Sequence, residues 1–366
     1  MIASRGIEKL NNELMELLRA RDERALDIID ELKRMGSEQN DDRLLGYAYY
    51  RYAYFYYFTK QDLKMFRVYL QQAIRYLLRG EDNEFLAGAY NLVAYDAQDQ
   101  GSFDMAYAYS IRALKLLAGE DELALPGLIE SSAGRMLAEI ENYETGLKLM
   151  LSAVEKLEKF TDMHVYNYNM IVSYADIALV SFLTGDADRV RSAVEKIEAY
   201  YENASDEERS LSYTYYMLPR IYLTMMMDDD EEMDSLVSEL LEFWSELNDA
   251  ELVGLITEMD AMFSFMLSHD YITQAKNMLE ATAVLKDGEN AAVAIRYCAL
   301  EIAYCEKVHD MKNLRESLRV QHEARKRQKA DVARMTKYSM EFADMAEALA
   351  RERDARSKSE VSSDIS

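Results

Sequence analysis

The sequence predicts an all-α solenoid: about eight helical hairpins stacked one on the next, followed by a long C-terminal helix. A turn signature returns about every forty residues along most of the chain. Only two prolines and 13 glycines occur in 366 residues, so few residues oppose helix formation. A fixed period of this length is typical of stacked helical hairpins, because one hairpin cannot bury its apolar face alone.

The turn signature lies between two amphipathic stretches in each unit. It is clearest at Gly101-Ser102-Phe103, Glu141-Asn142-Tyr143, Gly185-Asp186-Ala187, His269-Asp270-Tyr271 and His309-Asp310-Met311. Earlier and weaker copies fall at Arg21-Asp22, Gln61-Asp62 and Asp228-Asp229-Asp230. Aspartate in this position is suited to capping the second helix of a hairpin. The two His-Asp pairs are therefore predicted to be structural turns rather than catalytic dyads or metal ligands.

Residues 90–113 form the clearest repeat unit. Small residues at Ala94 and Ala106 allow its two helices to approach closely, and Gly101 can take the left-handed conformation that ends the first helix. Tyr90 and Phe103 supply the aromatic wedges between hairpins. Residues 130–153, 174–197 and 258–281 repeat this pattern, which resembles the tetratricopeptide-repeat superfamily over about residues 5–325. The resemblance implies a superhelical array that binds peptides or proteins.

Three segments are predicted: a repeat domain over 1–325, a long coiled-coil-like helix over 326–357 and a flexible tail over 358–366. Apolar residues in the long helix step by three and four, as in a short dimer seam. Its members are Val332, Met335, Phe342, Ala346 and Leu349. The alternatives are a helix that dimerises and transmits a signal, and a helix that caps the last hairpin.

The net charge of −25 predicts that the chain repels nucleic acid and anionic membrane surfaces. No stretch is long and apolar enough for a membrane span. Cys298 and Cys305 are seven residues apart on one predicted helix, which is too far for a disulfide. A cytoplasmic location is expected.

The resemblance implies that the first helix of each hairpin lines a concave groove. The groove positions carried over are Arg51, Phe55, Asn91, Tyr95, Arg135, Tyr222, Met259 and Phe263. They predict a polar and cationic half for the backbone or carboxylate of an extended peptide, and a Met-rich and aromatic half for its side chains. The alternative is an inert packed interior.

No phosphate loop, zinc-protease motif, nucleophile elbow or cysteine-pair motif is present, so neither a cofactor nor catalysis is expected. The last residues, 358–366, resemble the lead-in to the phosphoacceptor helix of bacterial sensor histidine kinases. A repeat array before a coiled-coil helix is also similar to the input half of bacterial GGDEF diguanylate cyclases. These resemblances imply a sensory input region whose output domain would follow. The alternatives are a free-standing cytoplasmic adaptor and an enzyme that uses the groove.

Overall fold

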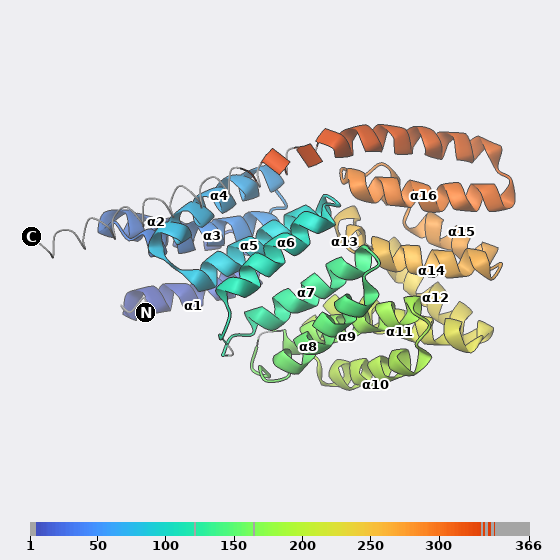
Figure 1. Ribbon diagram of the computed structural model, residues 1–366, viewed down its shortest axis with the longest axis horizontal. Coiled ribbons are helices and arrows are strands. Elements are labelled where there is room, and N and C mark those ends of the chain that lie inside the picture. Colours follow the sequence, from blue (N-terminus) through green and yellow to red (C-terminus); the bar gives the residue numbers. More distant parts are fainter. Residues whose placement is uncertain are drawn as a thin grey trace, which may run out of the picture. The chain divides into compact units, whose positions relative to one another are not determined.

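The computed structural model describes residues 5–120, 122–163 and 165–330, together with 332, 333, 336, 337 and 340. These residues form helices joined by short turns, and no β-strand occurs among them. Consecutive helices pack as antiparallel neighbours in sequential pairs (Figure 1). The predicted fold class, an all-α solenoid, is confirmed.

The helices follow one another along the chain with short connections. They are α1 (Arg5–Arg19), α2 (Ala25–Gln39), α3 (Asp42–Phe58), α4 (Leu63–Gly80), α5 (Asn83–Asp99), α6 (Phe103–Leu116), α7 (Leu125–Glu139), α8 (Tyr143–Leu157), α9 (Tyr166–Leu183), α10 (Ala187–Asn203), α11 (Asp206–Met227), α12 (Asp230–Ser245), α13 (Asp249–Val253), α14 (Ile256–Ser268), α15 (Ile272–Ala281), the 3-10 turn η1 (Ala283–Lys286) and α16 (Ala291–Val308). A further helix, unlabelled in Figure 1, runs through residues 311–330.

The chain divides into two compact units. Among the described residues, unit 1 contains those of 1–96, 108–119 and 333–366, and unit 2 contains those of 97–107 and 120–332. The division cuts through α5 and α6, so the turn between these two helices belongs to unit 2. Each unit has an apolar core of its own.

The eight predicted turns share one backbone feature. In every one of them, one residue adopts the left-handed conformation with a positive φ. These residues are Arg21, Gln61, Gly101, Glu141, Gly185, Asp228, Asp270 and His309. A left-handed residue ends the first helix, and its neighbour begins the second. The forty-residue signature therefore marks a repeated backbone geometry.

The residue after the left-handed position usually caps the following helix. The Asp62 side chain accepts hydrogen bonds from the backbone N–H groups of Lys64 and Met65, and Asp186 and Asp310 cap in the same way. Asp270 differs from the expected N-cap because it occupies the left-handed position itself. Its carboxylate forms an ion pair with Lys307 at 2.5 Å. Both predicted His-Asp turns are structural turns in the fold.

Unit 1 is built around the aromatic helix α3. Tyr47, Tyr52 and Phe55 are buried in its core. Tyr52 stacks on Tyr69 of α4 with ring centroids 4.5 Å apart, and its hydroxyl donates to Asp30 of α2. α3 carries aromatic residues on more than one face over residues 47–58, whereas a surface helix needs only one apolar stripe. Neighbouring helices cover much of this aromatic surface.

Unit 2 has an inner and an outer layer of helices. The first helices of successive pairs, α7, α9, α11, α14 and α16, each contact the next, and their partners α8, α10, α12 and α15 pack behind them. Trp244 of α12, the only tryptophan of the chain, is fully buried in the largest apolar core of this unit. The inner layer of unit 2 positions the candidate functional site.

Two glycines allow α7 and α8 of unit 2 to approach each other closely. A Cβ atom on Gly146 of α8 would lie 2.7 Å from the carbonyl oxygen of Gly134 in α7, and a Cβ on Gly134 would lie 2.8 Å from that of Gly146. Both contacts are shorter than carbon and oxygen tolerate, so only glycine fits at either position. The small residues of the repeat signature have this packing role.

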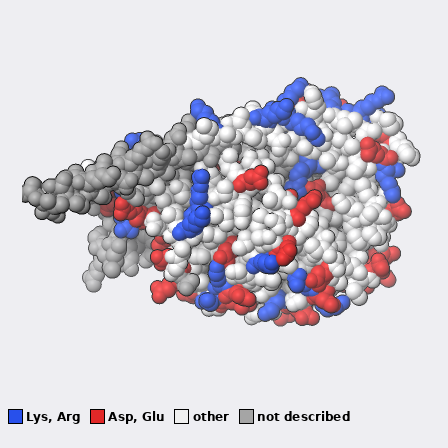
Figure 2. Space-filling model, viewed as in Figure 1, with Lys and Arg blue, Asp and Glu red and all other residues white. Residues whose placement is uncertain are grey.

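The surface charge is unevenly distributed along the chain. Residues 311–330 carry seven Lys or Arg and two Asp or Glu, although the whole chain is strongly acidic. Figure 2 shows basic side chains along the upper edge, where this helix runs, and both signs intermixed below it. Within the described residues, no helix combines the length and apolar character needed to cross a bilayer. Cys298 and Cys305 are buried and unpaired on α16.

Candidate functional site

The inner layer of unit 2 encloses a network of buried charges centred on Arg135. One guanidinium nitrogen of this α7 residue contacts both Asp176 of α9 and Glu258 of α14, the latter at 2.8 Å. Its Nε lies 3.6 Å from Glu139, one turn further along α7. The side chains of all four residues are at most 10% exposed. Three carboxylates therefore surround a single cation in the interior.

A second arginine extends the network to the last pair of helices. Arg296 of α16 donates to Glu139 at 3.2 Å and to the Thr257 hydroxyl at 3.1 Å. Its Nε also donates to Asp260 at 2.6 Å. The Glu139–Arg296 pair joins residues 157 apart in sequence. We call Arg135, Glu139, Asp176, Glu258, Asp260 and Arg296 the ion network.

The repeat brings these charges together from helices that are far apart in sequence. Arg135 and Asp176 are 41 residues apart, and Glu258 lies two further intervals of 41 along the chain. Equal repeat positions face the same side of a helical array. Because α7 reaches α14 and α16 through the network, the inner layer of unit 2 curves tightly enough to enclose these positions.

Burial has a clear effect on the acids of the ion network. Burial, reinforced by the nearby charge of Glu258, raises the pKa of Asp176 to about 6 even though Arg135 opposes the shift. Burial also raises the pKa of Asp260. For Arg135, burial alone would lower the pKa, but the surrounding carboxylates outweigh it and raise the pKa well above its usual value. Arg135 therefore stays charged, whereas the Asp176 carboxyl group gains a proton when the pH falls through about 6.

Three buried polar atoms in and beside the network have no hydrogen-bond partner among the described residues. They are Arg135 Nε, Glu258 Oε2 and the hydroxyl oxygen of Tyr222. The Tyr222 hydroxyl is close enough to the network for Glu258, Arg135 and Asp176 to influence its pKa, which burial raises strongly. An unsatisfied buried polar group costs about 1–3 kcal/mol, so three such atoms mark a part of the interior that is not optimised for stability.

A cavity of about 240 Å³ opens beside the ion network. We call it pocket A. Arg135, Glu139 and Arg296 of the network line its wall together with Thr257. The rest of the wall comes from the α5–α6 turn, the α13–α14 junction, the start of α16 and helix 311–330: Gln98, Asp99, Gly101, Phe103, Val253, Gly254, Ile256, Asn290, Ala292, Val293, Ile295 and Gln328.

Hydrogen bonds fix the rim of pocket A. The Asn290 side chain caps α16 and donates to the carbonyl oxygen of Asp99 at 2.8 Å. Arg327 of helix 311–330 donates to the Gly288 carbonyl at 3.2 Å. A Cβ atom on Gly101 would lie 3.1 Å from Ala292 and 3.3 Å from Gln328, so the α5–α6 turn fits closely against both elements. The pocket is thus formed by segments from both ends of unit 2.

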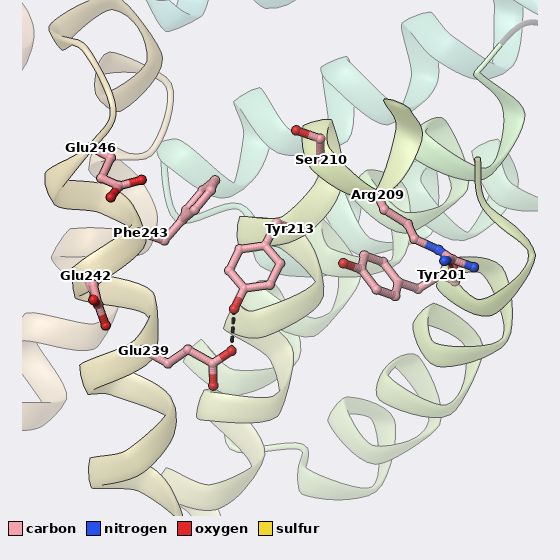
Figure 3. Close-up of a pocket in the computed structure, with 8 residues that line it drawn as sticks. All are labelled: Tyr201, Arg209, Ser210, Tyr213, Glu239, Glu242, Phe243 and Glu246. Atoms are coloured by element: carbon pink, nitrogen blue, oxygen red, sulfur yellow. Dashed lines mark hydrogen bonds between the residues drawn. The ribbon is translucent and has the colours of Figure 1, made fainter. Parts of the chain in front are cut away.

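A second and more open hollow of about 420 Å³ lies between α11 and α12, with Tyr201 of α10 at its edge (Figure 3). We call it hollow B. Phe243 packs against Tyr213 with ring centroids 4.8 Å apart, and the Tyr213 hydroxyl donates to Glu239. Glu239, Glu242 and Glu246 line its α12 side and are solvent-exposed. None of the buried unpartnered side-chain atoms found among the described residues lies here, which makes pocket A the better candidate.

The structure places the four predicted groove residues of unit 2 at different depths. Arg135 lines pocket A. Tyr222, Met259 and Phe263 are at most 1% exposed and pack in the main core of unit 2, where Tyr222 stacks on Phe182. These three side chains are part of the packed core and do not line pocket A.

The four predicted groove residues of unit 1 line neither pocket A nor hollow B. Phe55 is fully buried, and Asn91 is nearly so, with no hydrogen-bond partner for its Oδ1 among the described residues. Arg51 is half-buried and lies over the Tyr47 ring at 4.9 Å. Tyr95 contacts Phe58 edge-to-face. This part of the predicted groove stays a prediction.

The predicted dimer seam falls mostly outside the described residues. Val332 is described and exposed, whereas Met335, Phe342, Ala346 and Leu349 lie beyond the part of the chain that the structure describes. The seam and the boundaries at 326 and 358 stay predictions.

Most members of the ion network were missed at the level of sequence. Asp176 interrupts an otherwise apolar and small-residue run in α9, and Glu258 precedes a Met-rich run in α14. A charge at the same repeat position in successive apolar helices is the signal that could have identified both. Glu139, Asp260 and Arg296 carry no comparable signal, because their role depends on how tightly unit 2 curves.

No metal or known relative adds to this site. Within the described residues, no cluster of histidine, cysteine and carboxylate side chains has the geometry of a metal site. Comparison of the sequence with known protein families and with curated proteins gives no match.

Proposed function

We propose that this protein is a peptide- or protein-binding regulatory module of tetratricopeptide-like architecture, and that pocket A is its binding site. The observation that carries the proposal is the pocket itself, in which an apolar wall meets the buried charges of Arg135, Glu139 and Arg296 on the inner layer of a helical array, and the Nε of Arg135 has no hydrogen-bond partner among the described residues. Pockets that combine apolar lining with a few fixed polar groups are typical ligand sites. Inner helix faces are also where helical arrays commonly present their binding surfaces.

The favoured context is the sensory input region of a bacterial signalling protein, such as a diguanylate cyclase or a histidine kinase. Helix 311–330, which precedes the predicted dimer seam, contributes Gln328 to the pocket wall. The same helix is fixed to the rim by Arg327 and to α16 by a 3.2 Å hydrogen bond from Gln321 to the Ile295 carbonyl. A ligand in pocket A would therefore contact the helix that leads to the predicted output side.

The alternative is a free-standing cytoplasmic adaptor. The adaptor would bind its ligand in the same pocket as the sensory protein. The two proposals differ only in the role of helix 311–330 and the residues after it, which in an adaptor would cap the array. Light scattering distinguishes the two contexts: the sensory proposal expects a dimer that a chain ending at residue 323 no longer forms. The adaptor alternative expects both forms to be monomers.

A library of random linear peptides, displayed with free and with blocked N-termini, tests the binding proposal. Selected peptides are synthesised, and their affinity for the full chain is measured by fluorescence anisotropy. Val253→Trp places a large side chain in pocket A and should weaken binding at least tenfold. Ser210→Trp adds the same side chain at hollow B and serves as the matched control, with binding unchanged.

The binding proposal fails if no peptide is enriched over an unrelated protein. The assignment to pocket A fails if Val253→Trp binds the selected peptides as well as the Ser210→Trp control does. Circular dichroism and cooperative thermal unfolding establish that both variants are folded.

A further inference from the structure

The ion network carries more negative than positive charge. Four carboxylates, Glu139, Asp176, Glu258 and Asp260, face two guanidinium groups, those of Arg135 and Arg296. All four are in direct contact with one or both cations, so the imbalance belongs to one connected group. With every acid ionised, the network has a net charge of −2.

The excess charge reaches pocket A directly. Glu139 belongs to the network and to the pocket wall, and it lies between the two arginines. Its side chain is only 6% exposed, so water screens its charge weakly. As a carboxylate in the pocket wall, Glu139 is an acceptor that suits a ligand that donates hydrogen bonds.

An anionic ligand is disfavoured by the same contacts. A peptide carboxylate would need Arg135 or Arg296, but the protein's own carboxylates already surround both guanidinium groups. Adding an anion would increase a negative charge that is already in excess. A cation would offset this charge while the arginines kept their existing partners.

We infer that pocket A takes a cationic group, an ammonium or a guanidinium, as the polar anchor of its ligand. The apolar wall of Val253, Ile256 and Val293 suits the methylene stem of such a group. In a peptide the anchor is a lysine or arginine side chain or the N-terminal ammonium; a small free amine offers the same chemistry. This inference specifies the ligand class of the site assigned above and rests on that proposed function.

Three blocked tripeptides of equal size test the inference. They are acetyl-Ala-Lys-Ala-amide, acetyl-Ala-Gln-Ala-amide and acetyl-Ala-Glu-Ala-amide, titrated into the full chain by calorimetry at fixed ionic strength. The lysine peptide should bind at least tenfold more tightly than the other two. Butylamine, 1-butanol and butyrate form a parallel series that shows whether the amine alone is sufficient.

Glu139→Gln removes the charge shared by the network and the pocket. It should weaken binding of the lysine peptide at least tenfold and abolish the preference for lysine over glutamine. Glu242→Gln removes one exposed charge at hollow B and is the matched control for general attraction to an acidic protein, with the preference unchanged. Asp260→Asn, which leaves the pocket wall intact, should cause a smaller loss of about threefold and covers the case in which Glu139→Gln does not fold.

The inference is overturned if the glutamate peptide binds as tightly as the lysine peptide, if no cationic probe binds, or if the lysine peptide loses no affinity in Glu139→Gln or, where that variant does not fold, in Asp260→Asn. Its failure differs from that of the proposed function. Displayed peptides that bind pocket A through acidic or neutral residues would sustain the function and refute the cation. Binding of butylamine without any peptide binding would sustain the cation and refute a peptide-binding role.

Discussion

Replacing Arg135 by methionine should strongly destabilise unit 2. Methionine keeps most of the apolar stem and removes the guanidinium, which leaves Asp176 and Glu258 buried without their shared cation. Removing one partner of a buried ion pair typically costs about 3–5 kcal/mol, because the remaining charge is uncompensated. Glu139 keeps its contact with Arg296, so it adds little to the cost. We therefore expect a loss of about 3–5 kcal/mol in the unfolding free energy at pH 7.5.

The assay is urea unfolding followed by the emission of Trp244. This residue is the only tryptophan of the chain and is buried in the core of unit 2, so its signal reports on this unit. Arg191→Met is the matched control: Arg191 is 45% exposed on α10 and forms an i,i+3 ion pair with Asp188. Surface pairs contribute about 0–1 kcal/mol, so the control should stay within about 0.5 kcal/mol of the wild type.

The effect of Arg135→Met should also depend on pH. Near pH 5 the carboxylates left behind can bind protons, so the cost of the missing guanidinium should shrink by at least about 1 kcal/mol. A loss below about 1 kcal/mol at pH 7.5 would refute the argument, because it would place Arg135 among surface residues rather than at the centre of a buried network.

Further predictions concern the network and the helix contacts. Burial and the charge of Glu258 raise the pKa of Asp176 to about 6, so the folded state holds the proton of the Asp176 carboxyl group more tightly than the unfolded chain does. Protonation of Asp176 therefore stabilises the fold; this contribution is complete below about pH 4 and is lost as the pH rises through 6. In urea unfolding, the free energy of Asp176→Asn relative to wild type should therefore improve by about 2 kcal/mol between pH 4.5 and 7.5, and a flat difference would contradict the shift. Gly146→Ala should cost about 2–3 kcal/mol in thermal unfolding because its Cβ meets a backbone oxygen at 2.7 Å, whereas Gly254→Ala, with no atom closer than 3.9 Å, should change stability by less than about 0.5 kcal/mol. Ser205→Ala breaks the capping box of α11 and should cost about 1–2 kcal/mol in the same assay; an unchanged melting temperature would show that the cap is dispensable.

The sequence was sufficient for the repeat because its signature is local. A left-handed residue followed by a capping side chain depends on a few neighbouring residues, and the structure has this geometry at all eight predicted turns. The Ser205–Glu208 capping box follows from local chemistry in the same way. The short helix α13 begins at a capping box of its own, Asn248–Glu251, but the forty-residue period alone gives no place for this helix or for the turn η1.

The site was less predictable because it depends on curvature. The resemblance to tetratricopeptide repeats implies an inner position for Arg135, but it does not say whether the helices opposite lie far enough apart to leave an open groove. In unit 2, Glu258 and Arg296 come close enough to join the same network. Arg135 was expected to meet the carboxylate of a ligand and instead meets carboxylates of its own chain. The chemistry assigned to the residue therefore depends on the packing distance between inner helices.

The ion network places charged residues on the inner layer of unit 2, where apolar residues could also fill the core. Replacing a buried ion cluster by apolar residues of similar volume is often neutral or stabilising, so stability alone does not account for six charged residues on the inner layer. A variant with Arg135, Asp176 and Glu258 all replaced by apolar residues should fold with a stability close to wild type, in contrast to the single Arg135→Met change. If it also loses the preference for cationic probes, the network serves recognition in pocket A. If it keeps that preference, Glu139 and the pocket rim are sufficient, and the charges around Arg135 serve the closure of the inner layer.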